Sequence, residues 1–229
     1  MIFSTDHIPW SVFFLPIVNH YCLILLTIDF SSAILKHKIC KGGVSLTLTK
    51  TKTQILCALF AALIAIGAFL RVPVPLVPFT LQFLFTTLAG MFLGPGLGTA
   101  SVAAYIALGL AGLPIFAQGG GPGYVLLPSF GYLLGFAAGT FLTGKLLQHS
   151  GELSAVRIFA ASLAGLAAVY LIGMSYYYWI SNYVLDTPIA FGPLMLYCFV
   201  LAVPGDLAIC ILCGILGKRI LPAVRRFLP

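Results

Sequence analysis

Apolar runs long enough to cross a lipid bilayer dominate the chain from residue 54 to residue 217. The clearest is QILCALFAALIAIGAFL at 54–70, which carries no charged side chain. The other runs lie at 81–93, 99–117, 130–147, 155–180 and 194–217. A transmembrane helix needs ~20 predominantly apolar residues. Only 7% of the 229 residues are charged, far below the ~25% of soluble domains. The sequence therefore predicts an all-α integral membrane protein with six transmembrane helices.

The basic residues predict how these helices are oriented. Twelve Lys and Arg stand against five Asp and Glu, and most of them flank the apolar runs, which favours membrane orientation over nucleic-acid binding. The flanking basic residues that six spans would bring to one side are Lys36, Lys38, Lys41, Lys50, Lys52, Lys145, Arg157, Lys218, Arg219, Arg225 and Arg226. Only Arg71 falls on the other side. We expect a multi-pass protein of the cytoplasmic (inner) membrane, with the flank before the first helix and the C-terminus in the cytoplasm.

The first 52 residues do not fit the six-helix pattern. We divide the chain into an N-terminal extension at 1–52 and a transmembrane domain at 53–229. The apolar segment at 8–28 is a candidate for an extra span, although Asn19 and His20 interrupt it. A segment lying on the lipid surface and a later translation start remain as alternatives.

Two short motifs suggest enzymatic or metal chemistry but lie in the wrong context. GTFLTGKL at 139–146 has the G-x-x-x-x-G-K core of a phosphate-binding loop. It lacks the following Ser or Thr and lies on an apolar helix rather than after a strand. Cys210 and Cys213 are one helical turn apart in an apolar run, where membrane packing explains them better than a metal or redox site. The sequence predicts no enzyme, no metal and no cofactor.

Asp206 is the strongest candidate for a ligand-binding residue. It lies in FVLAVPGDLAICIL, with apolar residues on both sides and a Pro204-Gly205 break before it. A charge at membrane depth is costly and usually functional, and interrupted helices there need a cavity or protein cover. The alternative is an aspartate that caps a helix at the membrane edge.

A stiff segment and a glycine-rich loop are expected to form the rim of an outward-facing pocket. RVPVPLVPFTLQ at 71–82 has three prolines, which hold the connection between the first two helices extended. Arg71 would meet an anionic ligand first, or it would simply anchor the helix end among lipid headgroups. The loop from Gln118 to Tyr124 has glycines that permit close approach to a ligand.

Small residues on the first helix are spaced for close helix packing. They are Ala58 and Ala62, and Ala61 and Ala65. Such spacing lets helix backbones approach closely in lipid. The face serves either packing inside the bundle or docking of another membrane subunit.

The order of these segments resembles the BioY biotin transporters, the substrate-binding (S) components of energy-coupling factor (ECF) transporters. The resemblance runs from about residue 54 to 217 through RVPVPLVPFTLQ, LAGMFLGPGLGTASVAAYIALGLAGLPIFA, LLPSFGYLLGF and VPGDL. It implies a six-helix S-component fold, high-affinity biotin binding and uptake, and partnership with a transmembrane coupling subunit and ATPase subunits. It also implies that small residues on the first helix dock the coupling subunit.

The resemblance carries the family's motif positions to Asp206, Gln82 and Tyr132. The carboxylate of Asp206 would accept hydrogen bonds from the ureido N–H groups of biotin. Gln82 and Gln118 offer amide donors and acceptors, Tyr124 and Tyr132 would pack on the ring or acyl chain, and Arg71 would pair with the carboxylate. The chain departs from the family at Ile209, where a lysine is frequent. Two rival functions remain, a solitary biotin carrier without an ATPase and a membrane assembly subunit without a small ligand.

Overall fold

The structure, a computed structural model, describes residues 45–72, 79–148, 154–185 and 187–227. The chain divides into two units, residues 1–54 and 55–229, and the account below concerns the second. The apolar segment expected at 8–28 lies outside the described residues, as do most of the flanking lysines before the first helix.

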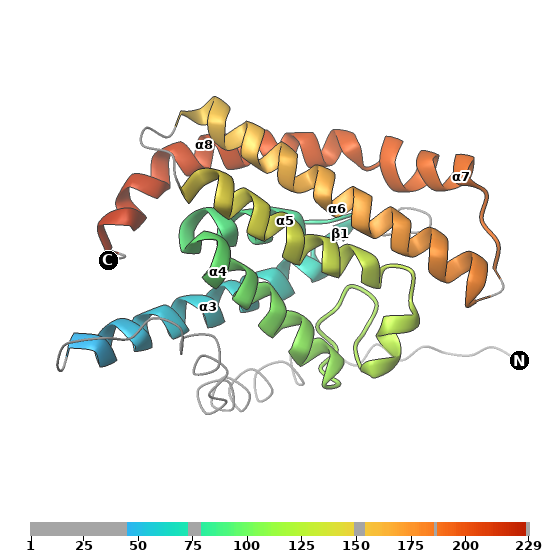
Figure 1. The fold of residues 1–229 in the computed structure, drawn as a ribbon, viewed down its shortest axis with the longest axis horizontal. Helices are drawn as coiled ribbons and strands as arrows, with labels where there is room; N and C mark the ends of the chain where they lie inside the picture. The colour runs from blue at the N-terminus through green and yellow to red at the C-terminus, as the bar shows by residue number, and fades with distance from the viewer. Residues whose placement is uncertain (1–44, 73–78, 149–153, 186, 228–229) are drawn as a thin grey trace, which may run out of the picture. The chain divides into compact units, whose positions relative to one another are not determined.

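The described part of the chain is almost entirely helical (Figure 1). Its long helices are α3 (Ser45–Phe69), α4 (Gln82–Leu110), α5 (Phe130–Gln148), α6 (Ala155–Tyr183) and α8 (Val203–Phe227). Its short elements are β1 (Arg71–Val72), β2 (Phe79–Thr80), the 3-10 turn η1 (Pro122–Leu126), α7 (Phe191–Met195) and the π-helical turn η2 (Leu196–Val200). Five helical segments in this part are long and apolar enough to cross a membrane. The all-α class is therefore confirmed, with long helices that suit a membrane by length and composition.

The difference between five helices and the expected six lies at Gly94. The runs at 81–93 and 99–117 both fall in α4, which is interrupted where Gly94 takes φ 79° and Pro95 follows. A Cβ added at Gly98 would lie 2.8 Å from the carbonyl oxygen of Ala89. Nine residues of continuous helix would separate these positions by ~13 Å. The two halves of α4 therefore fold back on each other as a helical hairpin.

Two other helix ends differ from the sequence expectation. The run at 99–117 was expected to be helical throughout, but α4 ends at Leu110 because Gly112 adopts φ 110° and Pro114 follows. The last run, at 194–217, is divided into α7, η2 and α8, with a turn at Leu201–Ala202 just before Pro204. The helix is thus irregular just ahead of the expected break, whereas Pro204 and Gly205 themselves lie in the first turn of α8.

Glycines set the close spacing of the central helices. Helix α5 packs against both α4 and α6, and α8 packs against α6 and α4; Figure 1 shows α5 between its two neighbours. A Cβ at Gly135 or Gly139 would come within 2.8 Å of a carbonyl oxygen of α6, and one at Gly90 within 2.5 Å of the Thr140 carbonyl oxygen. This small-residue spacing is the usual means of close helix contact in lipid.

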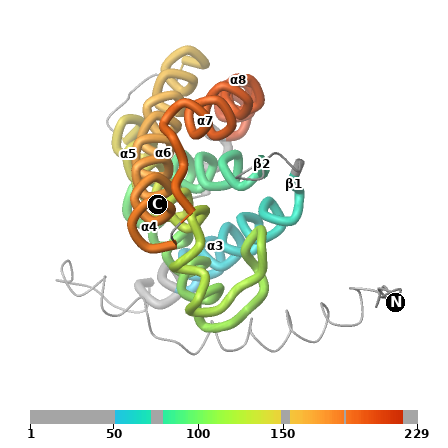
Figure 2. The backbone as a smooth tube through the Cα atoms, turned by 90° about the vertical axis from the view of Figure 1, so that its right-hand side faces the viewer, coloured from blue at the N-terminus to red at the C-terminus, as the bar shows by residue number. Residues whose placement is uncertain are grey.

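The described basic residues of the second unit lie toward two ends of the bundle. Helices α5 and α6 run antiparallel, so Lys145 near the end of α5 and Arg157 near the start of α6 share one end. The late part of α8, which carries Lys218 and Arg219, reaches the same end, because Gly214 lies against the carbonyl of Ala155. Arg71 belongs to β1, which pairs with β2 (Figure 2). Its side chain donates to the carbonyl of Ala117 in the loop ahead of α5, and thus lies toward the start of α5, away from Lys145. The described basic residues of this unit therefore separate into the two groups that the sequence predicts.

Candidate functional site

A cavity lies among α4, α5, α6 and α8, with the loop before α5 and the η2 turn completing its wall. Aromatic and aliphatic side chains form most of the lining, among them Phe83, Phe136, Leu166 and Val169. A mainly apolar pocket with a few polar groups is the usual form of a small-molecule site. The polar groups of the lining therefore decide what it can hold.

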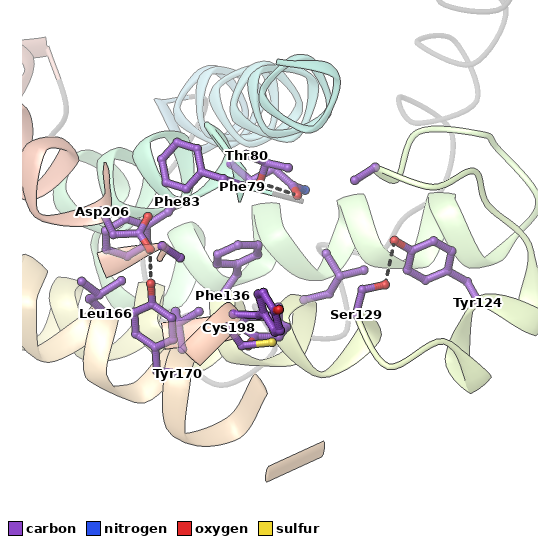
Figure 3. A pocket seen from close by; sticks show the side chains of 17 residues that line it. Phe79, Thr80, Phe83, Tyr124, Ser129, Phe136, Leu166, Tyr170, Cys198 and Asp206 are labelled. Carbon is purple, nitrogen blue, oxygen red and sulfur yellow. Dashed lines mark hydrogen bonds between the residues drawn. The ribbon is translucent and has the colours of Figure 1, made fainter. Parts of the chain in front are cut away.

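Asp206 places a carboxylate at one end of this cavity (Figure 3). Its side chain is 8% exposed and lies in the first turn of α8. One carboxylate oxygen accepts a 2.5 Å hydrogen bond from the Tyr170 hydroxyl of α6. Among the described residues, no Lys, Arg or His side chain lines the cavity. The carboxylate thus has a neutral partner and acceptor capacity left for a ligand.

Gln82 is held rigidly at the start of α4. Its amide nitrogen donates to the Tyr105 hydroxyl at 2.8 Å, and Tyr105 donates in turn to the carbonyl of Ile115 at 3.1 Å. Its amide oxygen accepts from the Thr80 hydroxyl at 3.2 Å. The side chain is buried and lines the cavity. One amide N–H and one oxygen lone pair remain for a ligand.

Tyr132 brings a hydroxyl without a hydrogen-bond partner to the cavity. The residue comes from α5, is 9% exposed and lines the pocket. Within the described part of the chain its buried hydroxyl meets the geometry of no hydrogen bond, and its polar neighbour is the thiol of Cys198, a weak partner. The ring fits because Gly173 of α6 has no side chain, and a Cβ there would lie 2.6 Å from the ring. An unpaired buried hydroxyl is uncommon and calls for an explanation. A ligand that pairs with it is one.

The other predicted residues lie at the far end of the cavity, where Figure 3 shows Tyr124 and Ser129. Tyr124 is buried in η1 and lines the pocket, and the Ser129 hydroxyl lies within 3.4 Å of its oxygen. Gln118 is exposed and does not line the pocket, but its side-chain oxygen lies 3.3 Å from the same Ser129 hydroxyl. Arg71 is also exposed, and it donates to the carbonyl of Ala117, which does line the pocket.

The positive charge of Arg71 affects the pKa of the Tyr124 phenol. Burial raises the pKa of the Tyr124 phenol above its ordinary value. The hydrogen bonds from Ser129 and from the backbone of Gln118, and the positive charge of Arg71, act in the opposite direction. The guanidinium of Arg71 is therefore close to this end of the cavity, whereas the other end holds the carboxylate of Asp206.

Four of the six predicted site residues thus line one cavity, and Gln118 and Arg71 contact residues that line it. The sequence reasoning did not find Tyr170, Ser129 or Cys198. Tyr170 stands in LAAVYLIG, an ordinary membrane run, and its only signal is a hydroxyl at membrane depth. Cys198 lies in a π-helical turn, a rare element that is frequent at functional sites.

The small residues of α3 do not share one environment. Ala61 is 4% exposed and belongs to the buried core, and Ala65 packs against that core. Ala58 is half-buried, while Ala62 is exposed. The two spacings therefore serve different faces, one turned to the bundle and one turned outward.

The structure also shows where the phosphate-loop-like segment and the paired cysteines lie, which the sequence did not favour as sites of catalysis or metal binding. The GTFLTGKL segment is continuous helix in α5. In the part of the chain that the structure describes, His, Cys, Asp and Glu side chains form no cluster that could hold a metal ion. Cys210, Cys213 and Ile209 are buried in the core. Ile209 therefore brings no charge to the carboxylate of Asp206 one turn away.

Comparisons with known proteins agree with this arrangement. The model of the BioY family matches residues 39–226. A probable biotin transporter BioY from Lysinibacillus sphaericus is 38% identical over 175 residues, covering 76% of this chain and 89% of its own. The biotin transporter BioY of Thermotoga maritima is 41% identical over 117 residues, covering 51% and 68% respectively. A crystal structure of the S-component for biotin from an ECF-type ABC transporter covers 78% of this chain and 94% of its own, with 29% identity and a TM-score of 0.56. The chain belongs to the BioY family.

Proposed function

We propose that this chain binds biotin in the cavity between α4, α5, α6 and α8 and takes it up as the S component of an ECF-type transporter. One observation carries the proposal: a mainly apolar cavity with a buried carboxylate at one end and a guanidinium just beyond the other. Biotin has the complementary form, with ureido N–H donors at one end, an apolar middle and a carboxylate at the other. The likeness to a solved S-component for biotin supports the same ligand.

The polar groups suggest how biotin lies in the cavity. The ureido N–H groups point to Asp206, since charge-assisted hydrogen bonds are the strong ones and a lost partner there is costly. The Tyr132 hydroxyl and the remaining amide N–H of Gln82 serve the ureido carbonyl. The acyl chain runs along the apolar wall toward Tyr124, and its carboxylate lies near Arg71 and Gln118. The reverse orientation would place two carboxylates together at Asp206.

We propose that partner subunits supply ATP hydrolysis, since the phosphate-loop-like segment of this chain is a packed helix. We propose that the outward face of α3, with Ala58 and Ala62, docks the membrane coupling subunit by close helix contact. Ala61 and Ala65 contribute to the same helix but face the bundle core.

We propose six spans, with the two halves of α4 counted separately because they fold back at Gly94. The end of the bundle with Lys145, Arg157, Lys218 and Arg219 is then cytoplasmic. The end with Arg71 and the mouth of the cavity faces outward. Exposed aromatic side chains near the end of α6, Tyr178, Trp179 and Tyr183, support a membrane interface there.

Residues 53–229 are proposed to carry biotin binding, and residues 1–52 are not needed for it. A chain beginning near Gly43 is expected to bind biotin as tightly as the full chain. Loss of binding in that truncation would make the extension an integral part of the protein.

Uptake of labelled biotin, in cells without another biotin transporter, tests the proposal. The chain is produced alone and together with a coupling subunit and ATPase subunits. We expect saturable, energy-dependent uptake only with the partners. Uptake by the chain alone would establish a solitary carrier, and absence of both uptake and binding would favour an assembly subunit.

A further inference from the structure

We propose that Tyr170 is a positioning residue for biotin, which acts by holding the Asp206 carboxylate in one orientation. This inference rests on the proposed function and adds to it a residue that no sequence pattern indicates. The hydroxyl of Tyr170 donates to one carboxylate oxygen at 2.5 Å (Figure 3). Both side chains line the cavity, and both are buried.

The ring of Tyr170 is itself fixed by its neighbours. It packs edge-on against Phe199 of the η2 turn, with ring centroids 5.1 Å apart and planes at 71°. Edge-to-face pairs of this kind stabilise one ring position. The backbone of α6 holds Tyr170 from one side, and the η2 turn covers the other side of its ring. The donor therefore reaches the carboxylate from a fixed direction.

Asp206 needs such a donor because the described structure gives it no cation. A carboxylate at this depth is expensive unless it is hydrogen-bonded. The residue one turn further along α8, Ile209, is a buried aliphatic side chain, and no described basic side chain lines the cavity. A neutral phenol satisfies one oxygen and leaves the negative charge in place. That charge remains available to a ligand with N–H donors.

The hydrogen bond also sets the geometry of recognition. A carboxylate can accept about four hydrogen bonds, and Tyr170 takes one of them on Oδ2. The plane of the carboxylate is then fixed, so that its remaining acceptor sites keep one direction relative to the cavity. A pair of ureido N–H groups needs that fixed direction for both bonds to form. Without Tyr170 the carboxylate would rotate, and binding would include the cost of ordering it.

The competing explanation is that Tyr170 only fills space between α6 and η2. The two explanations differ in how Tyr170 depends on Asp206. A packing role is independent of the carboxylate, whereas a positioning role disappears once the carboxylate is gone. A double-mutant cycle separates them.

The experiment measures equilibrium binding of labelled biotin to purified full-length protein in lipid nanodiscs. Four forms complete the cycle: wild type, Tyr170→Phe, Asp206→Ala and the double variant. We expect Tyr170→Phe to weaken binding about threefold to tenfold, the effect of one net hydrogen bond. The double variant is expected to bind no more weakly than Asp206→Ala alone. Tyr178→Phe is the control on the same helix, since Tyr178 is partly exposed in α6 and does not line the cavity, and its affinity should match wild type.

Each other result overturns the inference. Unchanged affinity in Tyr170→Phe, or an effect that adds in full to that of Asp206→Ala, would assign Tyr170 to packing. If Tyr170→Phe is not recovered as folded protein, Tyr170→Met replaces it, since methionine fills the space without a donor. Failure of both to fold would show that the hydroxyl holds the bundle rather than the carboxylate. Absence of biotin binding in wild type would overturn the proposed function itself, a result separate from these.

Discussion

Removing the buried hydroxyl of Tyr132 is predicted to weaken biotin binding without lowering the stability of the ligand-free protein. Replacing Tyr132 by Phe removes one buried oxygen and keeps the ring that fills the space beside Gly173. Without ligand, the variant loses at most a weak contact with the Cys198 thiol, because the hydroxyl meets the geometry of no hydrogen bond in the described structure. With biotin bound, it loses one of the two proposed partners of the ureido carbonyl, the other being the amide of Gln82.

The size of the effect follows from the cost of an unsatisfied polar group. A buried donor or acceptor without its partner costs about 1–3 kcal/mol. In wild type that cost is present before binding and is relieved by the ligand. In Tyr132→Phe no unsatisfied hydroxyl is present before binding, and after binding it is the carbonyl of the ligand that lacks this partner. Since 1.4 kcal/mol is a factor of ten, biotin affinity should fall about fivefold to hundredfold, while the ligand-free protein should be equally or more stable.

The assay pairs equilibrium binding of labelled biotin with thermal melting of the ligand-free protein, both in the same detergent or nanodisc. We expect weaker binding together with an unchanged or higher melting temperature. Tyr183→Phe, at an exposed position near the end of α6, is the control and should change neither. Unchanged biotin affinity in Tyr132→Phe would refute the reasoning. A lower ligand-free melting temperature would also refute it, because the hydroxyl would then have a structural partner.

Three further substitutions test packing, docking and the cavity mouth. Gly139→Ala should destabilise the ligand-free protein by about 1–3 kcal/mol, because its Cβ would meet a carbonyl oxygen at 2.8 Å, whereas Gly123→Ala, with open space around it, should melt like wild type; equal melting of the two would contradict the glycine packing. Ala62→Trp should prevent co-purification with the coupling subunit and leave biotin binding intact. Ala61→Trp should lose both assembly and binding, because Ala61 is buried. A loss of biotin binding in Ala62→Trp would assign this face to internal packing. Arg71→Gln should weaken binding of biotin more than binding of biotin methyl ester, and an equal effect on both ligands would place the carboxylate elsewhere.

Much of the membrane architecture could be predicted because a helix that contacts lipid needs a long run of apolar residues, and such runs are visible in the sequence. The apolar runs predicted the long helices, and Pro204 and Gly205 predicted an irregularity near Asp206, which the structure has just ahead of them, at Leu196–Val200 and the following turn. Hydropathy could not separate helix from apolar loop, so the run at 99–117 was extended past Leu110. It also could not show that Gly94 allows α4 to fold back on itself, which requires the close contact between Gly98 and Ala89.

The site was predictable where a residue is unusual for its surroundings. Asp206 stood out as a charge in an apolar run, and Arg71 as the single basic residue on its side. Tyr170 and Ser129 did not stand out, because hydroxyl-bearing residues are common in such helices and loops. Their roles depend on which helices meet, and that information is not contained in any local pattern.

Equilibrium binding of labelled biotin to the purified protein and to Asp206→Asn tests the central claim most directly. Asparagine keeps the shape and an oxygen that accepts from Tyr170, but it removes the charge and turns an N–H group toward the ureido donors. We expect wild type to bind biotin at one saturable site. Because hydrogen bonds to charged groups are worth about 1.5–3 kcal/mol, the variant should bind biotin about tenfold to hundredfold more weakly, and its melting temperature without ligand should change little. Biotin binding of equal affinity in both proteins, or none in wild type, would contradict the account.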